Sequence, residues 1–166
     1  RIKEEIVSSK FNVDIKNKGD YIEPKQLKEL LDNNEDIVLL DARNNYEFDI
    51  GRFKDAIHLD LDTFRQFPEK IKQLKKIVNI KNKKIVTYCT GGIRCEKASA
   101  LMRENGFNDV FQLHGGILTY GNEVGNEHWK GKCFVFDTRG AIDIDPNSDS
   151  VPITQCALCN IPNADL

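Results

Sequence analysis

Apolar residues follow two patterns along the central part of the chain. Short runs rich in β-branched and apolar residues alternate with segments whose apolar residues recur every three or four positions, as on one face of a helix. The runs predict strands at 37–40, 56–59, 84–88 and 110–113, and the spaced segments predict helices at 24–32, 46–50, 67–78, 95–105 and about 117–121. Repeated alternation of strand and helix predicts an α/β fold, a parallel sheet with helices on both faces.

The flanking segments have a different character. Residues 14–20 are polar and turn-rich, which is typical of a linker or loop. Toward the other end, Phe134-Val135-Phe136 predicts a buried strand, and the segment from Asp143 has a loop-like composition. Asp137 and Arg139 are expected to anchor this part onto the core. We therefore expect an irregular C-terminal extension beside the α/β domain.

Composition excludes several classes of protein. Lys and Arg number 24 against 26 Asp and Glu, which gives a net charge of −2. The chain therefore has no overall positive charge that would by itself attract nucleic acid. The longest apolar runs are a few residues, far below the ~20 that span a bilayer, so no membrane partner is expected. The five cysteines are odd in number and follow no export signal, which favours reactive or metal-binding thiols over disulfides. A cytoplasmic location is the resulting expectation.

One loop carries the candidate chemistry. Cys89-Thr90-Gly91-Gly92-Ile93-Arg94 follows a predicted strand and precedes a predicted helix, at the sheet edge where α/β proteins bind ligands. The two glycines allow successive backbone amides to curl around one point, and the helix N-terminus and Arg94 add positive charge. Such a cradle should lower the pKa of the Cys89 thiol below ~8.5 and make it nucleophilic. It would equally stabilise a persulfide on Cys89.

The length of the loop helps to separate related chemistries. Cysteine phosphatases and arsenate reductases of similar architecture use Cys-x5-Arg, which leaves room for a tetrahedral oxyanion. Here Arg94 lies five positions after Cys89, giving Cys-x4-Arg, a tighter cradle that suits a single terminal sulfur. The alternative is a buried structural cysteine beside a helix-capping glycine pair.

These motifs together resemble the rhodanese superfamily, whose members carry sulfur as a cysteine persulfide and pass it to a nucleophile. The resemblance covers about 20–126 and implies catalytic roles for Cys89 and Arg94, with Thr90, Gly91, Gly92 and Ile93 as the anion cradle. It rests on the active-site loop above and on three further groups of residues: Leu40-Asp41-Ala42-Arg43 with Glu47-Phe48 and Gly51, Ala56-Ile57-His58-Leu59, and Leu113-His114-Gly115-Gly116.

A narrower resemblance joins the loop, extended to Cys95-Glu96-Lys97, with the segment from Trp129 to Arg139. Together they resemble the rhodanese-containing tRNA uridine hydroxylases. That family implies oxygen-dependent 5-hydroxylation of the wobble uridine, with tRNA as partner and a ferredoxin-like domain before the rhodanese domain. It divides this chain into a linker at 1–19, the rhodanese domain at 20–126 and the extension at 127–166. Two alternatives stay open: a generic sulfurtransferase using a small donor such as thiosulfate, and a non-catalytic binding module.

Three residues around the loop have more than one expected role. Asp41 accepts hydrogen bonds from the active loop, orients Arg43 or caps a loop. Arg43 either adds positive potential to the site or pairs with Glu47, four residues on. Cys95 either attacks an oxidised or persulfidated Cys89, or is a small buried residue on the inner face of its helix. The second role is the expected one for Cys95.

The remaining candidates concern metal. Cys156-Ala157-Leu158-Cys159 is a Cys-x2-Cys motif, and zinc needs four ligands, so Cys156 and Cys159 would form a half-site. The resemblance places another cysteine pair beyond this chain; zinc is therefore expected only with ligands from outside, and no other cofactor is implied. Nothing in the spacing recommends Cys133 or His128 as the missing ligands. His58 and His114 are expected to be structural.

Overall fold

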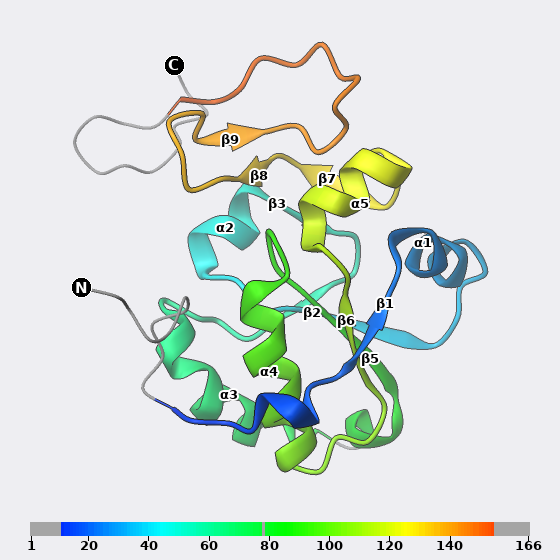
Figure 1. Ribbon diagram of the computed structural model, residues 1–166, viewed down its shortest axis with the longest axis vertical. Helices are drawn as coiled ribbons and strands as arrows, with labels where there is room; N and C mark the ends of the chain where they lie inside the picture. The colour runs from blue at the N-terminus through cyan, green and yellow to red at the C-terminus, as the bar shows by residue number, and fades with distance from the viewer. Residues whose placement is uncertain (1–10, 78, 155–166) are drawn as a thin grey trace.

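The structure, a computed structural model, describes residues 11–77 and 79–154. Its centre is a five-stranded parallel sheet with the order β1-β6-β5-β2-β4, so β5 is the middle strand (Figure 1). The prediction of a parallel α/β sheet is confirmed. The sheet strands are β1 (Asp20–Ile22), β2 (Ile37–Asp41), β4 (Ile57–His58), β5 (Lys84–Tyr88) and β6 (Val110–Leu113).

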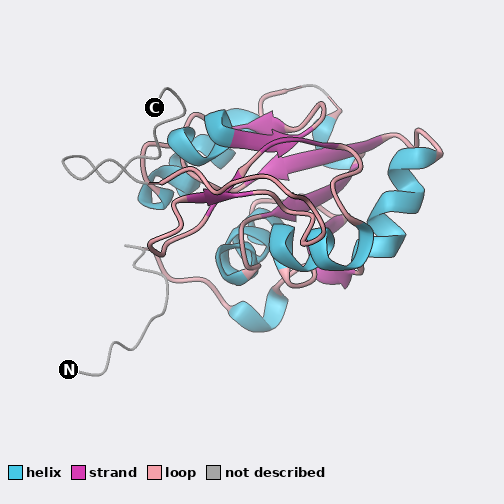
Figure 2. Ribbon diagram, turned by 90° about the horizontal axis from the view of Figure 1, so that it is seen from above, coloured by secondary structure: helices cyan, strands magenta, loops and turns pink. Residues whose placement is uncertain are grey.

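Helices cover both faces of this sheet, as Figure 2 shows from above. The helices α3 (Phe67–Leu74) and α4 (Ile93–Glu104) pack on one face, and α1 (Pro24–Asp32) and α5 (Gly116–Val124) pack on the other. Along β5, Ile85 belongs to the first core and Val86 to the second, because successive side chains point to opposite faces. A strand buried on both sides explains its continuous apolar composition.

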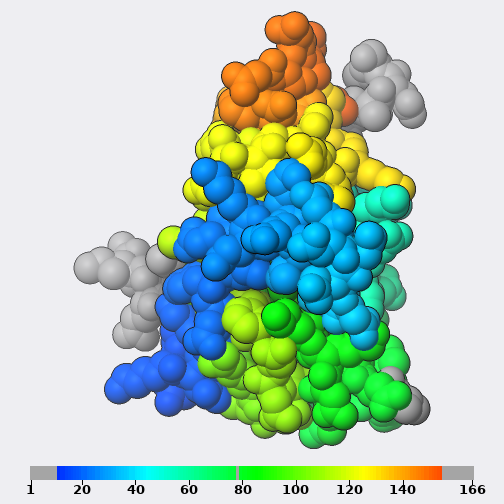
Figure 3. Space-filling model, turned by 90° about the vertical axis from the view of Figure 1, so that its right-hand side faces the viewer, coloured from blue at the N-terminus to red at the C-terminus, as the bar shows by residue number. Residues whose placement is uncertain are grey.

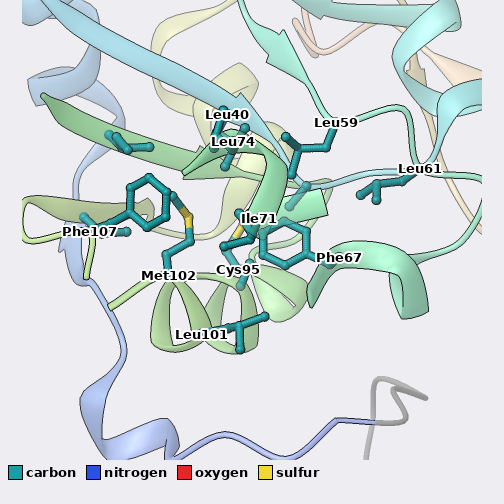
Figure 4. Close-up of a cluster of buried hydrophobic side chains, with 14 of the residues drawn as sticks. Leu40, Leu59, Leu61, Phe67, Ile71, Leu74, Cys95, Leu101, Met102 and Phe107 are labelled. Carbon is teal, nitrogen blue, oxygen red and sulfur yellow. The ribbon is translucent and has the colours of Figure 1, made fainter. Parts of the chain in front are cut away.

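The core between the sheet and helices α3 and α4 is closely packed. Figure 4 shows Cys95 of α4 beside Phe67 and Ile71 of α3, with Met102 of α4 and Leu40 of β2 in the same cluster. All five residues have no accessible surface. Fully burying a side chain of the size of Phe, Ile, Leu or Met contributes roughly 1.5–3 kcal/mol, so this contact fixes where α4 begins relative to the sheet.

The predicted element boundaries shift by a few residues. Helix α4 begins two residues earlier than expected, directly after the active loop, and α5 continues to Val124. The predicted helix 67–78 is described as α3 up to Leu74, and Val78 lies outside the described residues. The other helical elements of this part of the chain are the short helix α2 (Asn45–Ile50) and the 3-10 turns η1 (Ile15–Asn17), η2 (Phe64–Gln66) and η3 (Ile80–Asn82).

The C-terminal extension contains more regular structure than its composition indicates. β7 (Trp129–Gly131) pairs antiparallel with β3 (Gly51–Phe53), and β8 (Cys133–Phe134) pairs antiparallel with β9 (Ala141–Ile142). In Figures 1 and 3 this extension, coloured yellow to orange, forms one end of the molecule.

One prediction about the extension needs correction. The predicted buried strand 134–136 ends at Phe134, and the Phe136 side chain is exposed, because the chain turns between β8 and β9. Asp137 and Arg139 pair with each other on an exposed turn, at 2.7 Å between Oδ2 and Nη2. Their expected role as an anchor onto the core stays a prediction.

The segment before β1 lies against α4. The Gly19 amide donates to Ser99 Oγ (2.9 Å), and Arg103 Nη1 donates to the Lys18 carbonyl (2.7 Å). The placement of a domain boundary at residue 20 stays a prediction. Within the part of the chain that the structure describes, no helix is both long and apolar enough to cross a bilayer.

Candidate active site

The Cys89 loop joins the middle strand of the sheet to the N-terminus of α4. Gly92 caps this helix with φ of +87°, a left-handed conformation that favours glycine. Gly91, by contrast, has open space where a Cβ would lie and does not adopt positive φ. Both glycines were expected to be needed for the curl of the loop, but only Gly92 has a backbone conformation that favours glycine.

Several donors converge on the Cys89 sulfur. The Gly92 amide lies 3.1 Å from Sγ, and the amides of Arg94 and Cys95 also donate to it. The pKa of Cys89 is lowered to about 6, first by a hydrogen bond from the Cys95 thiol and then by the Arg94 charge and these amides, against burial, which raises it. The lowered pKa favours the thiolate form of Cys89, which is the direction that the loop predicts.

Cys95 is closer to the chemistry than its expected role as a small buried residue. Its side chain is fully buried on the inner face of α4, which agrees with that role, but its thiol also hydrogen-bonds to Cys89. Burial and the neighbouring thiolate raise the pKa of Cys95 well above its usual value. The two thiols thus share one proton, which stays on Cys95 at neutral pH.

Arg94 is held by Glu47, for which the sequence suggested Arg43 as a partner. Glu47 of α2 is fully buried and accepts both arms of the guanidinium, at 2.6 Å from Nη1 and 2.8 Å from Nη2. The Thr90 hydroxyl also points at Glu47, 3.4 Å from Oε1. A bidentate pair of this kind fixes the orientation of the guanidinium beside the Cys89 loop. The capping box that Glu47 forms with Asn44 marks the start of α2, whereas its partner Arg94 lies 47 positions away along the chain.

The second arginine is engaged differently, which corrects one expectation. Arg43 does not pair with Glu47 but with Asp41, at 2.6 Å between Nη2 and Oδ2, and both side chains are fully buried. Nη2 also donates to the Gly51 carbonyl (2.6 Å). Asp41 therefore orients Arg43, one of its three expected roles. Because this carboxylate neutralises the guanidinium locally, the pair supports the loop end of β2 rather than supplying free charge.

The Gly115-Gly116 turn packs against the backbone of the active loop. The amide of Ile117, in the first turn of α5, donates to the Cys89 carbonyl (3.0 Å), and that of Leu118 donates to the Thr90 carbonyl (3.2 Å). A Cβ on Gly116 would lie 2.5 Å from the Cys89 carbonyl oxygen, closer than real Cβ contacts come. This turn therefore needs glycine, because the two loops touch through their backbones.

The extension lies against the other side of the loop. Cys133 of β8 is fully buried, and its thiol hydrogen-bonds to the Thr90 hydroxyl. Phe136 lies beside Arg94, with 5.6 Å between the guanidinium carbon and the ring centroid. Cys89 is 2% exposed, whereas Ile93 in the same loop is 48% exposed. The sulfur is thus buried, while Arg94 and Thr90 of the loop around it contact residues of the extension.

The three histidines each contact a residue outside the Cys89 loop. His58 Nε2 bonds the Arg43 carbonyl (2.9 Å), and His114 Nδ1 contacts Glu23 (2.8 Å). Cys156 and Cys159 lie outside the described residues. His128 contacts Asp32.

Asp32, Glu127 and His128 offer ligand atoms within 4.8 Å of one another. Lys28 Nζ already bridges the two carboxylates, at 2.5 Å from Asp32 and 2.8 Å from Glu127. The cluster is therefore an ion-pair network that ties α1 to the segment between α5 and β7.

A parallel sheet with an anion-binding cysteine loop at the carboxyl end of its middle strand defines a class of α/β domains that hold sulfur or oxyanions on a thiolate. The protein-family model of the rhodanese-like domain matches residues 23–123, and the chain belongs to that family. The resemblance noted from the sequence motifs is thereby confirmed.

Curated relatives match beyond the domain itself. A tRNA uridine(34) hydroxylase of Cytophaga hutchinsonii is 50% identical over 96% of this chain, and one of Chlamydia felis is 46% identical over 96%. The chain spans about half the length of these relatives, 50% and 49%.

Solved structures agree on the fold. The rhodanese-like domain of an Anabaena protein has a TM-score of 0.56 at 19% identity, over 78% of this chain and 84% of that one. A thiosulfate sulfurtransferase of Pseudomonas aeruginosa has a TM-score of 0.56 at 17% identity, over 68% of this chain and 20% of that one.

Proposed function

We propose that this chain is the rhodanese-type part of an enzyme that hydroxylates carbon 5 of the wobble uridine in tRNA, with Cys89 as its reactive sulfur. The observation that carries the proposal is the span of the similarity. The family model ends at residue 123, but identity to the tRNA uridine(34) hydroxylases of 46–50% continues over 96% of the chain, so it includes the extension.

The geometry supports a thiolate that carries one extra sulfur. With thiosulfate as donor, the Cys89 thiolate would attack the outer sulfur, form a persulfide and release sulfite, so charge and atoms balance. The amides of Gly92, Arg94 and Cys95 and the charge of Arg94 would stabilise the terminal sulfur as they stabilise the thiolate. Arg94 stays in position because Glu47 holds it.

A second candidate function rests on the same loop. A generic sulfurtransferase would use this cradle to move sulfur from thiosulfate to a small acceptor, without any RNA. The Cys-x4-Arg loop and the lowered pKa of Cys89 favour this chemistry as much as the first. The two functions differ in the role of the extension, because small-molecule transfer does not need the wall that it adds beside the loop.

The test is the tRNA nucleoside profile of cells in which the full-length protein carries Cys89→Ala. We expect 5-hydroxyuridine to disappear, because the reactive sulfur is removed. Cys133→Ala is the matched control, since it removes a buried thiol outside the loop, and it should retain the nucleoside. Unchanged 5-hydroxyuridine in the Cys89→Ala cells would overturn the proposal. A gain of one sulfur atom on Cys89 after thiosulfate treatment, with transfer to cyanide, would then favour the sulfurtransferase.

A further inference from the structure

An exposed aromatic ring lies beside Arg94 of the Cys89 loop. Phe136 is 67% exposed, so most of its apolar surface faces solvent. It comes from the turn after β8, while its neighbour Arg94 comes from the active loop. The ring therefore lies on the surface beside the Cys89 loop and not in the core of the extension.

The ring is held in place on its other side. Phe134 packs edge-on against Phe136, with ring centroids 4.9 Å apart, and Tyr46 of α2 packs edge-on against Phe134 at 5.1 Å. Phe134 itself is only 5% exposed, so this row of rings starts in the interior and ends at the surface. A ring supported in this way keeps a fixed surface toward solvent.

The cation beside the ring is also fixed. Arg94 forms two bonds to buried Glu47 and lies 5.6 Å from the centroid of Phe136. Ile93, the residue before Arg94, adds a second exposed apolar side chain to the same loop. A rigid aromatic face next to a guanidinium is the surface on which proteins stack unpaired nucleobases.

We propose that Phe136 is the residue against which the unpaired target uracil stacks when it lies over the Cys89 loop. This inference rests on the proposed function and names the substrate contact of the same site. Enzymes that modify a base hold it out of the stack between apolar or aromatic side chains. The described extension, 127–154, therefore contributes a substrate contact that the rhodanese core lacks.

The experiment measures binding of a fluorescent anticodon stem-loop with uridine at the wobble position to the full-length protein. Phe136→Ala should raise Kd about tenfold or more, because stacking on an aromatic side chain contributes ~1–3 kcal/mol per base. Phe136→Trp should bind as the wild type does, and Phe136→Leu should resemble Phe136→Ala. The matched control is Ile77→Ala, an exposed apolar residue after α3, which lies toward the opposite end of the molecule from β8 (Figure 1).

Two further readouts keep this inference separate from the proposed function. The titration of the Cys89 thiol should be unchanged in Phe136→Ala, which shows that the ring acts on substrate and not through Arg94. Unchanged Kd in Phe136→Ala, or equal binding by the Leu and Trp variants, would overturn the stacking role even if Cys89→Ala abolishes 5-hydroxyuridine. Retention of the nucleoside in Cys89→Ala would instead overturn the proposed function.

Discussion

The active loop and β8 of the extension each bury a cysteine beside Thr90, yet the two thiols have opposite properties. Cys89 is 2% exposed and has a pKa of about 6, whereas Cys133 is fully buried and burial raises its pKa to about 12. Desolvation alone therefore makes a thiol inert. The difference arises from the partners that surround each sulfur.

Around Cys89 those partners are a thiol, amides and a guanidinium, all of which favour the anion. Around Cys133, Arg43 and the Thr90 hydroxyl favour the anion, but Glu47 opposes it and no loop of amides surrounds it. Reactivity in this fold therefore comes from donors supplied by the turn into α4 and not from burial or from cysteine as such.

The largest expected change in free energy comes from removing the Arg94 charge, which lies beside Cys89. In Arg94→Gln the pKa of Cys89 should rise, because the charge nearest its thiolate is lost. Glu47 would be left as a buried charge without its partner, a loss of about 3–5 kcal/mol in the free energy of unfolding. Urea denaturation measures the stability, and the ultraviolet absorbance of the thiolate measures the pKa.

A double variant separates these two effects. Arg94→Gln with Glu47→Gln removes both charges, so much of the stability should return while the pKa of Cys89 stays above that of the wild type. A double variant whose thiol titrates as the wild type does would show that Arg94 has no electrostatic role at the sulfur.

Cys95→Ala should change the free energy by less than Arg94→Gln does, although the Cys95 thiol is the first cause of the lowered Cys89 pKa. Cys95→Ala removes the thiol that donates to Cys89, and a hydrogen bond to a charged group contributes ~1.5–3 kcal/mol. At pH values below the Cys89 pKa the thiolate fraction should fall roughly tenfold or more. Cys95→Ser keeps a donor at the same place and should restore much of the lost fraction. Identical titrations for the Ala and Ser variants would mean that Cys95 only fills space.

The fold was predictable wherever a local pattern of apolar residues was enough to identify a strand or a helix. Continuous apolar runs such as 84–88 mark strands buried on both faces, and their alternation with helical spacing predicted the parallel sheet. The Cys89 loop was predictable for the same reason, because its residues are adjacent in sequence and the strand before it fixes its edge of the sheet. That Cys89 and Arg94 act in catalysis stays a proposal.

The contacts that escaped prediction join distant segments. Glu47 and Arg94 are 47 positions apart, and a local rule favoured the nearer Arg43 as the partner of Glu47. The position of Phe136 depends on where the chain turns between β8 and β9, which alternation of apolar residues does not show. The hydrogen bond between the Cys89 and Cys95 thiols depends on which face of α4 is turned toward the loop.

The central claim is that the loop holds Cys89 as an anion, and the pH titration of thiolate absorbance tests it without needing a reagent to reach the sulfur. The signal is taken as the difference between the wild type and Cys89→Ser, with Cys133→Ala as control. Because the pKa of Cys89 is lowered, the thiolate should persist as pH falls and disappear only near pH 6. The Cys133→Ala protein should give the same curve. A difference signal that titrates at the usual thiol value of ~8.5 or higher would contradict the account.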